Sequence, residues 1–168
     1  YDEAIECYQK ALAINPNYPA LHNNLGSVYK EIGRLDDALK SYKNALIYNP
    51  DYSESYNNLG TTFFELERFN EAFKALKKAI EIEPEYVDAH YNLAVTFKSL
   101  DQLDEAVKSY KRAIEINPNF AEAHNNLGNV FKDLKQLDDA AKSFKKAIAI
   151  RPDYADAHNN LGNVFKDL

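Results

Sequence analysis

The chain has 168 residues, with 26 acidic and 20 basic side chains, a formal net charge of −6, and neither tryptophan nor methionine. Net negative charge argues against a nucleic-acid-binding protein, because phosphate recognition needs clustered positive charge. The single cysteine, Cys7, excludes an intrachain disulfide. No apolar run approaches the length of a membrane span or a signal-peptide core, so we expect no membrane contact and a cytoplasmic location.

The prolines show that the sequence repeats every 34 residues. Five of the six follow this spacing: Pro16, Pro50, Pro84, Pro118 and Pro152. Other positions repeat with them, among them the columns Leu25, Leu59, Leu93, Leu127, Leu161 and Gly26, Gly60, Ala94, Gly128, Gly162. An aromatic column, Tyr29, Phe63, Phe97, Phe131 and Phe165, follows three residues later. A fixed period of this length predicts a protein built from stacked structural repeats.

The predicted elements follow this period along the chain, as one domain without a linker. Residues 1–18 contain the second helix of a partial repeat (1–14); complete helix–turn–helix repeats cover 19–52, 53–86, 87–120 and 121–154; and 155–168 form the first helix of a further partial repeat. Gly33 marks the turn inside the first complete repeat. The residue after a repeat proline, such as Asp51 or Asn119, is predicted to cap the next helix.

This pattern resembles the tetratricopeptide repeat, whose signature is an aromatic residue, Leu-Gly, a second aromatic residue, and then spaced Ala, aromatic, Ala and Pro. The first complete match is His22, Leu25, Gly26, Tyr29, Ala38, Tyr42, Ala45 and Pro50. The sequence departs from the signature at the first aromatic position, which holds His22, Tyr56, His90, His124 and His158. The resemblance covers the whole chain. It implies an all-α, right-handed superhelical solenoid of antiparallel helix pairs that holds another polypeptide.

The sequence predicts no enzyme, metal or cofactor. The histidine column would place its members on successive first helices, about 10 Å apart, too far to share one zinc ion. Carboxylates such as Asp36 and Asp138 fall at helix starts, where they complement the helix dipole. No glycine-rich phosphate loop or nucleophile motif occurs.

The resemblance implies that first helices line a concave groove whose exposed positions meet the ligand. These positions are mainly amides: Asn24, Asn58, Asn92, Asn126 and Asn160, preceded by Asn23, Asn57, Tyr91, Asn125 and Asn159, with Ser27, Thr61, Val95, Asn129 and Asn163 three residues beyond. An amide both donates and accepts, so such a ladder could pair with the backbone of an extended peptide. Hydrogen bonding within the scaffold is the alternative.

Three positions break the polar pattern of the predicted groove. Phe64 stands where other repeats carry lysine, and Tyr91 and Val95 replace polar residues. An apolar patch in a polar groove indicates a pocket for an apolar side chain. Sequence drift is the other interpretation.

A basic stripe marks the second helices: Lys40, Lys43, Lys74, Lys77, Lys78, Lys108, Lys111, Arg112, Lys142, Lys145 and Lys146. Acidic residues stand four positions before several of them, as Asp36 does before Lys40. This pairing favours a solvated helix face over a site for an acidic partner.

The leading functional prediction is a protein–protein interaction scaffold that binds an extended peptide or partner protein in its concave groove. The asparagine-lined repeats are similar to those of O-linked N-acetylglucosamine transferase, so the alternative is a substrate-recruiting module of a larger glycosyltransferase-like enzyme. The carboxylate clamp of chaperone-binding relatives is not expected, because its basic positions hold Asn23, Asn57 and Tyr91. A third interpretation is head-to-tail self-association through residues 1–14 and 155–168, whose helix has an interior-type face without a polar cap.

Overall fold

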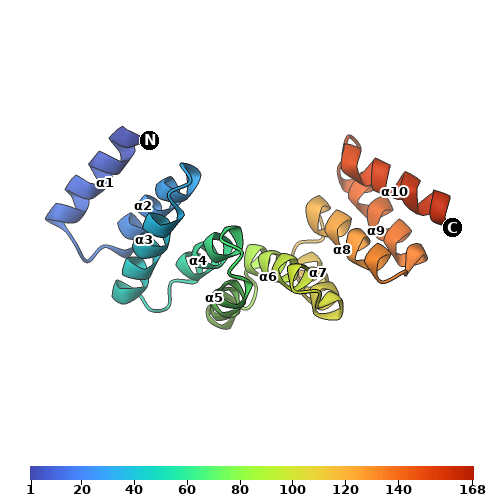
Figure 1. Cartoon of the computed structure of the whole chain (residues 1–168), viewed down its shortest axis with the longest axis horizontal. Coiled ribbons are helices and arrows are strands. Elements are labelled where there is room, and N and C mark those ends of the chain that lie inside the picture. Colours follow the sequence, from blue (N-terminus) through green and yellow to red (C-terminus); the bar gives the residue numbers. More distant parts are fainter. The chain divides into compact units, whose positions relative to one another are not determined.

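The computed structural model describes all 168 residues and contains ten α-helices and no strand (Figure 1). The helices are α1 (Asp2–Ile14), α2 (Pro19–Glu31), α3 (Leu35–Tyr48), α4 (Ser53–Glu65), α5 (Phe69–Ile82), α6 (Val87–Ser99), α7 (Leu103–Ile116), α8 (Ala121–Asp133), α9 (Leu137–Ile150) and α10 (Ala155–Asp167). The predicted all-α class is confirmed. None of these helices is long and apolar enough to cross a membrane.

The helices fall into two compact units, residues 1–84 and residues 85–168. In the first unit α2 pairs with α3 and α4 with α5, while α1 packs on α2. In the second unit α6 pairs with α7 and α8 with α9, while α10 packs on α9. Because the connecting turns are short, paired helices run antiparallel.

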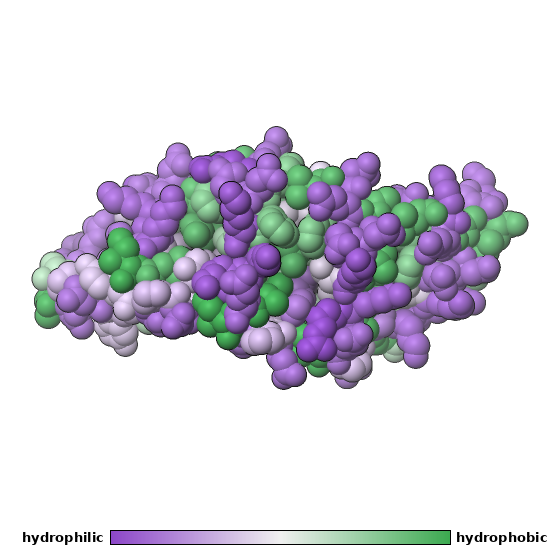
Figure 2. Space-filling view, turned by 90° about the horizontal axis from the view of Figure 1, so that it is seen from below, coloured by the Kyte–Doolittle hydropathy of each residue, from purple (hydrophilic) through white to green (hydrophobic).

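Each unit buries its own apolar core beneath a largely hydrophilic surface, of which Figure 2 shows one face. In the first unit the buried core comprises Ile5, Leu25, Tyr29, Ala38, Leu39, Tyr42, Leu59, Phe63, Ala72 and Ala75. In the second it comprises Ala94, Ala106, Tyr110, Ala123, Leu127, Val130, Phe131, Ala140, Ala141, Phe144 and Val164. Most of these residues belong to the repeating columns, because one helical hairpin cannot bury both of its faces.

The glycine column marks where the two helices of a hairpin approach most closely. A Cβ atom added at Gly26 would lie 2.7 Å from the ring of Tyr42, and one at Gly128 would lie 2.6 Å from the ring of Phe144. Such distances are too short for non-bonded carbon atoms, so Gly26 and Gly128 have a steric reason to be glycine, although the same column holds Ala94 in the third complete repeat. Gly162 is different, because a Cβ atom there would meet nothing within 4 Å.

The turn inside each hairpin contains one residue in the left-handed backbone region. Gly33 has φ of 75°, and Glu67, Asp101 and Lys135 have φ of 57°, 57° and 61° at the corresponding positions. This conformation ends the first helix and turns the chain into the second. The sequence pointed to Gly33 alone, but all four hairpins use the same turn.

The predicted helix caps at Asp51 and Asn119 are wrong. The first helices begin two residues later, and the residue that precedes α4 is Tyr52. Pro50 and Asp51 instead occupy a turn that Tyr52 closes, with its N–H 3.3 Å from the carbonyl oxygen of Asn49. The Asn49 side chain accepts from the Asp51 N–H at 3.2 Å. Proline favours the second position of such a turn because its φ is already fixed near the required value.

Candidate functional site

Asn23, on α2, is a structural link between neighbouring first helices. Its side chain is 1% exposed, and its Oδ1 accepts from Ser55 Oγ at 2.9 Å and from Asn58 Nδ2 at 3.1 Å. Its Nδ2 donates to Glu54 Oε1 at 2.9 Å. All of these partners lie on α4, so this amide fixes how α2 and α4 pack together.

The same link recurs in the second unit. Asn160 Nδ2, on α10, donates to Asn125 Oδ1 on α8 at 3.1 Å, and Asn126 Nδ2 donates to the Tyr91 hydroxyl on α6 at 2.8 Å. Each donor lies 35 residues after its acceptor, as Asn58 does after Asn23. Amide N–H groups of the predicted ladder are therefore used between first helices. Tyr91 takes the acceptor role that asparagine has elsewhere.

Other members of the predicted ladder differ in their surroundings. Asn24 is exposed, and no first helix precedes it in the described chain. Asn57 is buried, and Asn92 and Asn129 are half-buried. The Oδ1 atoms of Asn58 and Asn160 receive no hydrogen bond from the protein, and both side chains are partly exposed. These two oxygens are therefore acceptors open to a ligand.

A lysine column adds a second link that the sequence interpretation missed. Lys30 Nζ lies 2.7 Å from Thr61 Oγ1 and 3.1 Å from Glu65 Oε1 on the next first helix. In the second unit Lys98 Nζ lies 3.3 Å from Asp133 Oδ2. The acidic partners form a column in the sequence one residue after the lysines. The spacing does not show that a lysine side chain points toward the acid of the next repeat.

A polar cavity of about 380 Å³ lies on the first-helix side of residues 1–84. It is lined by Ser27, Lys30, Glu31, Tyr42, Asn58 and Glu65. The Tyr42 hydroxyl donates to Ser27 Oγ at 3.3 Å, and burial raises the pKa of Tyr42, which keeps it a neutral donor. Two of the lining residues, Ser27 and Asn58, belong to the predicted groove columns.

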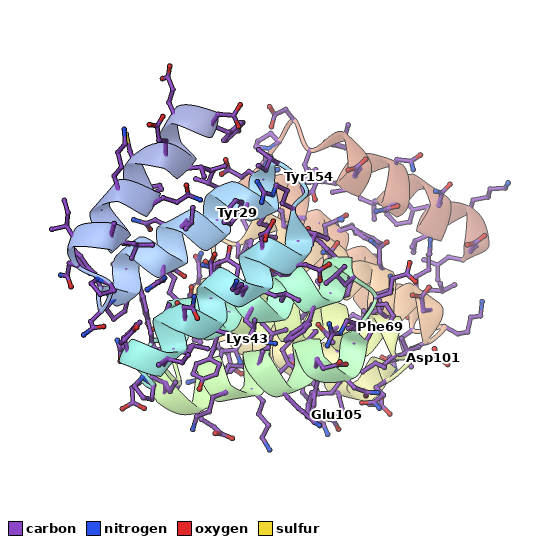
Figure 3. All side chains as sticks on the ribbon, turned by 60° about the vertical axis from the view of Figure 1, so that its left-hand side comes forward. Tyr29, Lys43, Phe69, Asp101, Glu105 and Tyr154 are labelled. Atoms are coloured by element: carbon purple, nitrogen blue, oxygen red, sulfur yellow. The ribbon has the colours of Figure 1, made fainter.

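The three apolar positions of the predicted pocket are each partly packed within their own unit. The Phe64 ring centroid lies 5.3 Å from that of Phe69, which Figure 3 labels at the start of α5. The Tyr91 ring centroid lies 4.9 Å from that of Phe120. Val95 is half-buried against the core of residues 85–168. Because Tyr91 also accepts from Asn126, this residue has a structural role besides any contact with a ligand.

Comparison with known proteins places the chain in a family. The sequence profile described as TPR repeat matches residues 1–33, 96–135 and 128–168, and two profiles described as tetratricopeptide repeat match residues 18–85 and 75–108. The chain belongs to the tetratricopeptide-repeat family. Tetratricopeptide-repeat proteins are interaction modules, so the chain is a protein-interaction scaffold.

Solved structures of tetratricopeptide-repeat proteins share this fold. The chain is 32% identical to MamA with a TM-score of 0.84, over 92% of this chain and 90% of that one. It is 26% identical to YrrB, described as a TPR protein with an unusual peptide-binding site, with a TM-score of 0.81 over 97% and 84% of the two chains. TTC0263, a thermophilic TPR protein in Thermus thermophilus, is 23% identical, with a TM-score of 0.80 over 99% and 91%. No curated protein matches significantly.

The histidines that replace the first aromatic residue of the tetratricopeptide repeat bind the preceding loop. The Nε2 atoms of His22, His124 and His158 lie 2.8, 3.1 and 2.9 Å from the carbonyl oxygens of Pro16, Pro118 and Pro152. His22 also stacks on Tyr48, with ring centroids 5.5 Å apart. A ring nitrogen thus satisfies a loop carbonyl that a phenyl ring could not, and the column has a structural role in this tetratricopeptide-repeat chain.

Acidic side chains at the starts of first helices also have partners. Glu54 accepts from the Tyr52 hydroxyl at 3.3 Å as well as from Asn23. Glu122 forms an ion pair and hydrogen bond with Arg151, which lowers the pKa of the Glu122 carboxyl. Of these two carboxylates only Glu54 keeps a charge that no cation balances, and its sign is opposite to that of a clamp for carboxylates.

Proposed function

We propose that the first-helix face of the chain binds an extended peptide, and that the cavity around Ser27 and Asn58 holds part of its backbone. The observation that carries this proposal is the 380 Å³ cavity, whose lining offers both donors and acceptors. A peptide N–H would donate to Asn58 Oδ1, which has no donor within the protein. A peptide carbonyl would accept from the Lys30 ammonium at the cavity edge.

The charges around this cavity favour a neutral or basic segment. Glu31 and Glu65 contribute two carboxylates, and Lys30 contributes one ammonium group that already contacts Glu65. A peptide that ends in an acidic residue would meet net negative charge. We infer further that apolar side chains of the ligand contact Phe64 in residues 1–84 and, separately, Tyr91 and Val95 in residues 85–168.

The test begins with an array of random nonapeptides, from which the tightest binder of the 168-residue chain is chosen as the probe. Ser27→Phe places a ring in the cavity, and we expect it to weaken binding by at least tenfold in fluorescence anisotropy. Lys40→Ala, exposed on the second helix α3, is the control and should change affinity less than twofold. Unaltered binding by Ser27→Phe with an unchanged thermal midpoint would sink the proposal.

The apolar contacts are tested with the same probe. Phe64→Ala and Tyr91→Ala should each weaken binding, while Tyr91→Phe separates loss of the ring from loss of the Asn126 hydrogen bond. If both alanine variants bind as the parent does, the apolar pocket is wrong even where the peptide site holds.

The transferase-module alternative rested on the asparagine ladder. Because the amide N–H groups of Asn58, Asn126 and Asn160 link neighbouring first helices, the ladder has a sufficient structural reason. It therefore gives no specific support to a glycosyltransferase. We propose an interaction module without a catalytic group of its own.

We also propose that the 168-residue chain associates head to tail through α1 and α10. On α10, Phe165 is 53% exposed and Leu168 is 65% exposed, whereas the corresponding Phe131 on α8 is 8% exposed. Gly162 stands at the repeat position of Gly26. The ring of Tyr42 packs on Gly26, whereas nothing covers Gly162. Tyr8 of α1 occupies the place in the repeat that Tyr42 has in α3, so α1 of a second copy carries the matching ring.

A further inference from the structure

A second kind of cavity lies on the opposite side of the repeats, between second helices. In residues 85–168 it has a volume of about 490 Å³ and lies over α8, between α7 and α9. Its lining residues that matter here are Lys111, Leu127, Phe131, Lys142 and Lys146. A volume of this size accommodates one large side chain together with part of the backbone that carries it.

A related cavity of about 430 Å³ occurs in residues 1–84, where α4 and the second helix α5 line it. Its lining includes Leu59, Phe63, Lys74 and Lys78, which occupy the repeat positions of Leu127, Phe131, Lys142 and Lys146. Residues at the same repeat positions therefore line both cavities.

The floor of each cavity is apolar and its rim is cationic. Leu127 and Phe131 are almost fully buried beneath the opening, as are Leu59 and Phe63. Lys111 Nζ stands 5.7 Å from the ring centroid of Phe131. In the other unit Lys43, labelled in Figure 3, places its Nζ 5.8 Å from the ring centroid of Phe63. The attraction between an ammonium group and an aromatic face is weak, so the same ammonium group can also contact a carboxylate.

Several of these ammonium groups have no acidic partner. Lys142 pairs with Asp139 at 2.9 Å, and Glu115 is held by Arg112 at 3.2 Å, so both acids of the larger cavity are neutralised. Lys111 and Lys146 have no carboxylate within ion-pair distance, nor has Lys74 in the smaller cavity. In a chain of net charge −6, this face is locally positive. These three lysines differ from the paired ones in that their ammonium groups are free to contact carboxylates of a ligand.

We propose that each of these cavities binds an acidic peptide segment of a partner protein, which inserts one aromatic side chain onto the apolar floor while its flanking carboxylates contact the unpaired lysines. The apolar floor supplies the pocket for the ring, and the rim supplies charge complementarity. This surface is separate from the first-helix groove, so one chain could hold two ligands of opposite charge preference.

The experiment titrates the isotopically labelled 168-residue chain with the peptide acetyl-Asp-Glu-Phe-Glu-Asp-amide and follows amide shifts by NMR. We expect saturable shifts at Leu127 and Phe131 and at Leu59 and Phe63, with affinity falling at least tenfold as salt is raised. The same peptide with Ala in place of Phe should bind at least tenfold more weakly. Equal affinity of the two peptides would overturn the pocket, since it would show attraction by charge alone.

Matched variants separate the rim from general charge. Lys111→Glu combined with Lys146→Glu should weaken binding to the larger cavity at least tenfold. Lys108→Glu combined with Lys145→Glu makes the same charge change on the same two helices outside the cavity, and should change affinity less than threefold. Equal loss in both double variants, or shifts confined to residues of the first-helix groove such as Ser27 and Asn58, would overturn the proposal without touching the first-helix peptide site.

Discussion

Gly128 and Gly162 occupy the same place in the repeat but have different surroundings. A methyl group at residue 128 would clash with the buried ring of Phe144, so Gly128→Ala should lower the free energy of unfolding by about 1–3 kcal/mol. At residue 162 there is open space, and Gly162→Ala should raise it by up to about 1 kcal/mol through helix propensity alone. Urea denaturation at micromolar concentration measures both. Two variants of the same sign would contradict the steric explanation.

Glu122 gives a pH-dependent contribution whose sign follows from its partner. Hydrogen bonding to Arg151 lowers the pKa of the folded-state carboxyl, so the stabilisation is fully present above the ordinary pKa of a glutamate. It is lost as the pH falls through the folded-state value. Because both side chains are partly exposed, the pair contributes about 0–1 kcal/mol.

Glu122→Gln should therefore be less stable than the parent at pH 7, and denaturation at pH 7 and pH 3 should show the difference shrinking at the lower pH. Glu105→Gln, whose partner Lys108 lies on the same helix, is a control for loss of charge without loss of a link to Arg151. A stability difference for Glu122→Gln that persists undiminished at pH 3 would show that the carboxylate charge is not its cause.

Some residue roles could be predicted from the sequence and others could not. The glycine column indicated close helix approach because glycine leaves room for a neighbouring helix. The surroundings of Gly26 and Gly128 confirm this. The asparagines did not reveal their partners, because an amide can face a ligand or the next helix with equal chemical ease. Asn23 and Asn58 bond each other across 35 residues, a pairing that no local pattern encodes.

At the scale of elements, three of the four hairpin turns hold a non-glycine residue in the left-handed backbone region, which is strained. Lys135 holds φ of 61°, a region that costs a residue with a Cβ roughly 1 kcal/mol relative to glycine. Lys135→Gly should therefore raise the thermal midpoint. Lys132→Gly, in the last turn of α8, should lower it, since glycine in a helix costs up to about 1 kcal/mol. If Lys135→Gly is as destabilising as Lys132→Gly, the turn conformation is not the limiting feature.

The helices themselves were predictable because their apolar stripes repeat, while their starting residues were not. Asp51 is a good cap by composition, but Pro50 places it inside a turn that Tyr52 closes. The residue at which α4 begins depends on which N–H donates to the Asn49 carbonyl oxygen. Residue preferences alone do not settle that competition.

At the scale of the whole molecule, the exposed face of α10 predicts association. Sedimentation equilibrium should show a weight-average mass that rises between about 10 µM and about 1 mM, the range expected for a contact of modest area. Gly162→Gln puts a bulky polar side chain where Tyr8 of a second copy would pack, and should abolish the rise. Asn163→Ala, exposed on the same helix, should not. A constant monomer mass for the parent chain would refute head-to-tail packing.

The links between first helices have a consequence for how such a chain can change length. Asn58 reaches Asn23, and Asn160 reaches Asn125, with donor and acceptor separated by 35 residues in both cases. Excising or duplicating 34 consecutive residues moves a new amide into the place of the old one, so each donor still finds an acceptor. An insertion within a repeat whose length is not a multiple of 34 breaks the register of this ladder. Gene rearrangements in whole repeats therefore preserve these links, and variation in repeat number is the change that this architecture tolerates best.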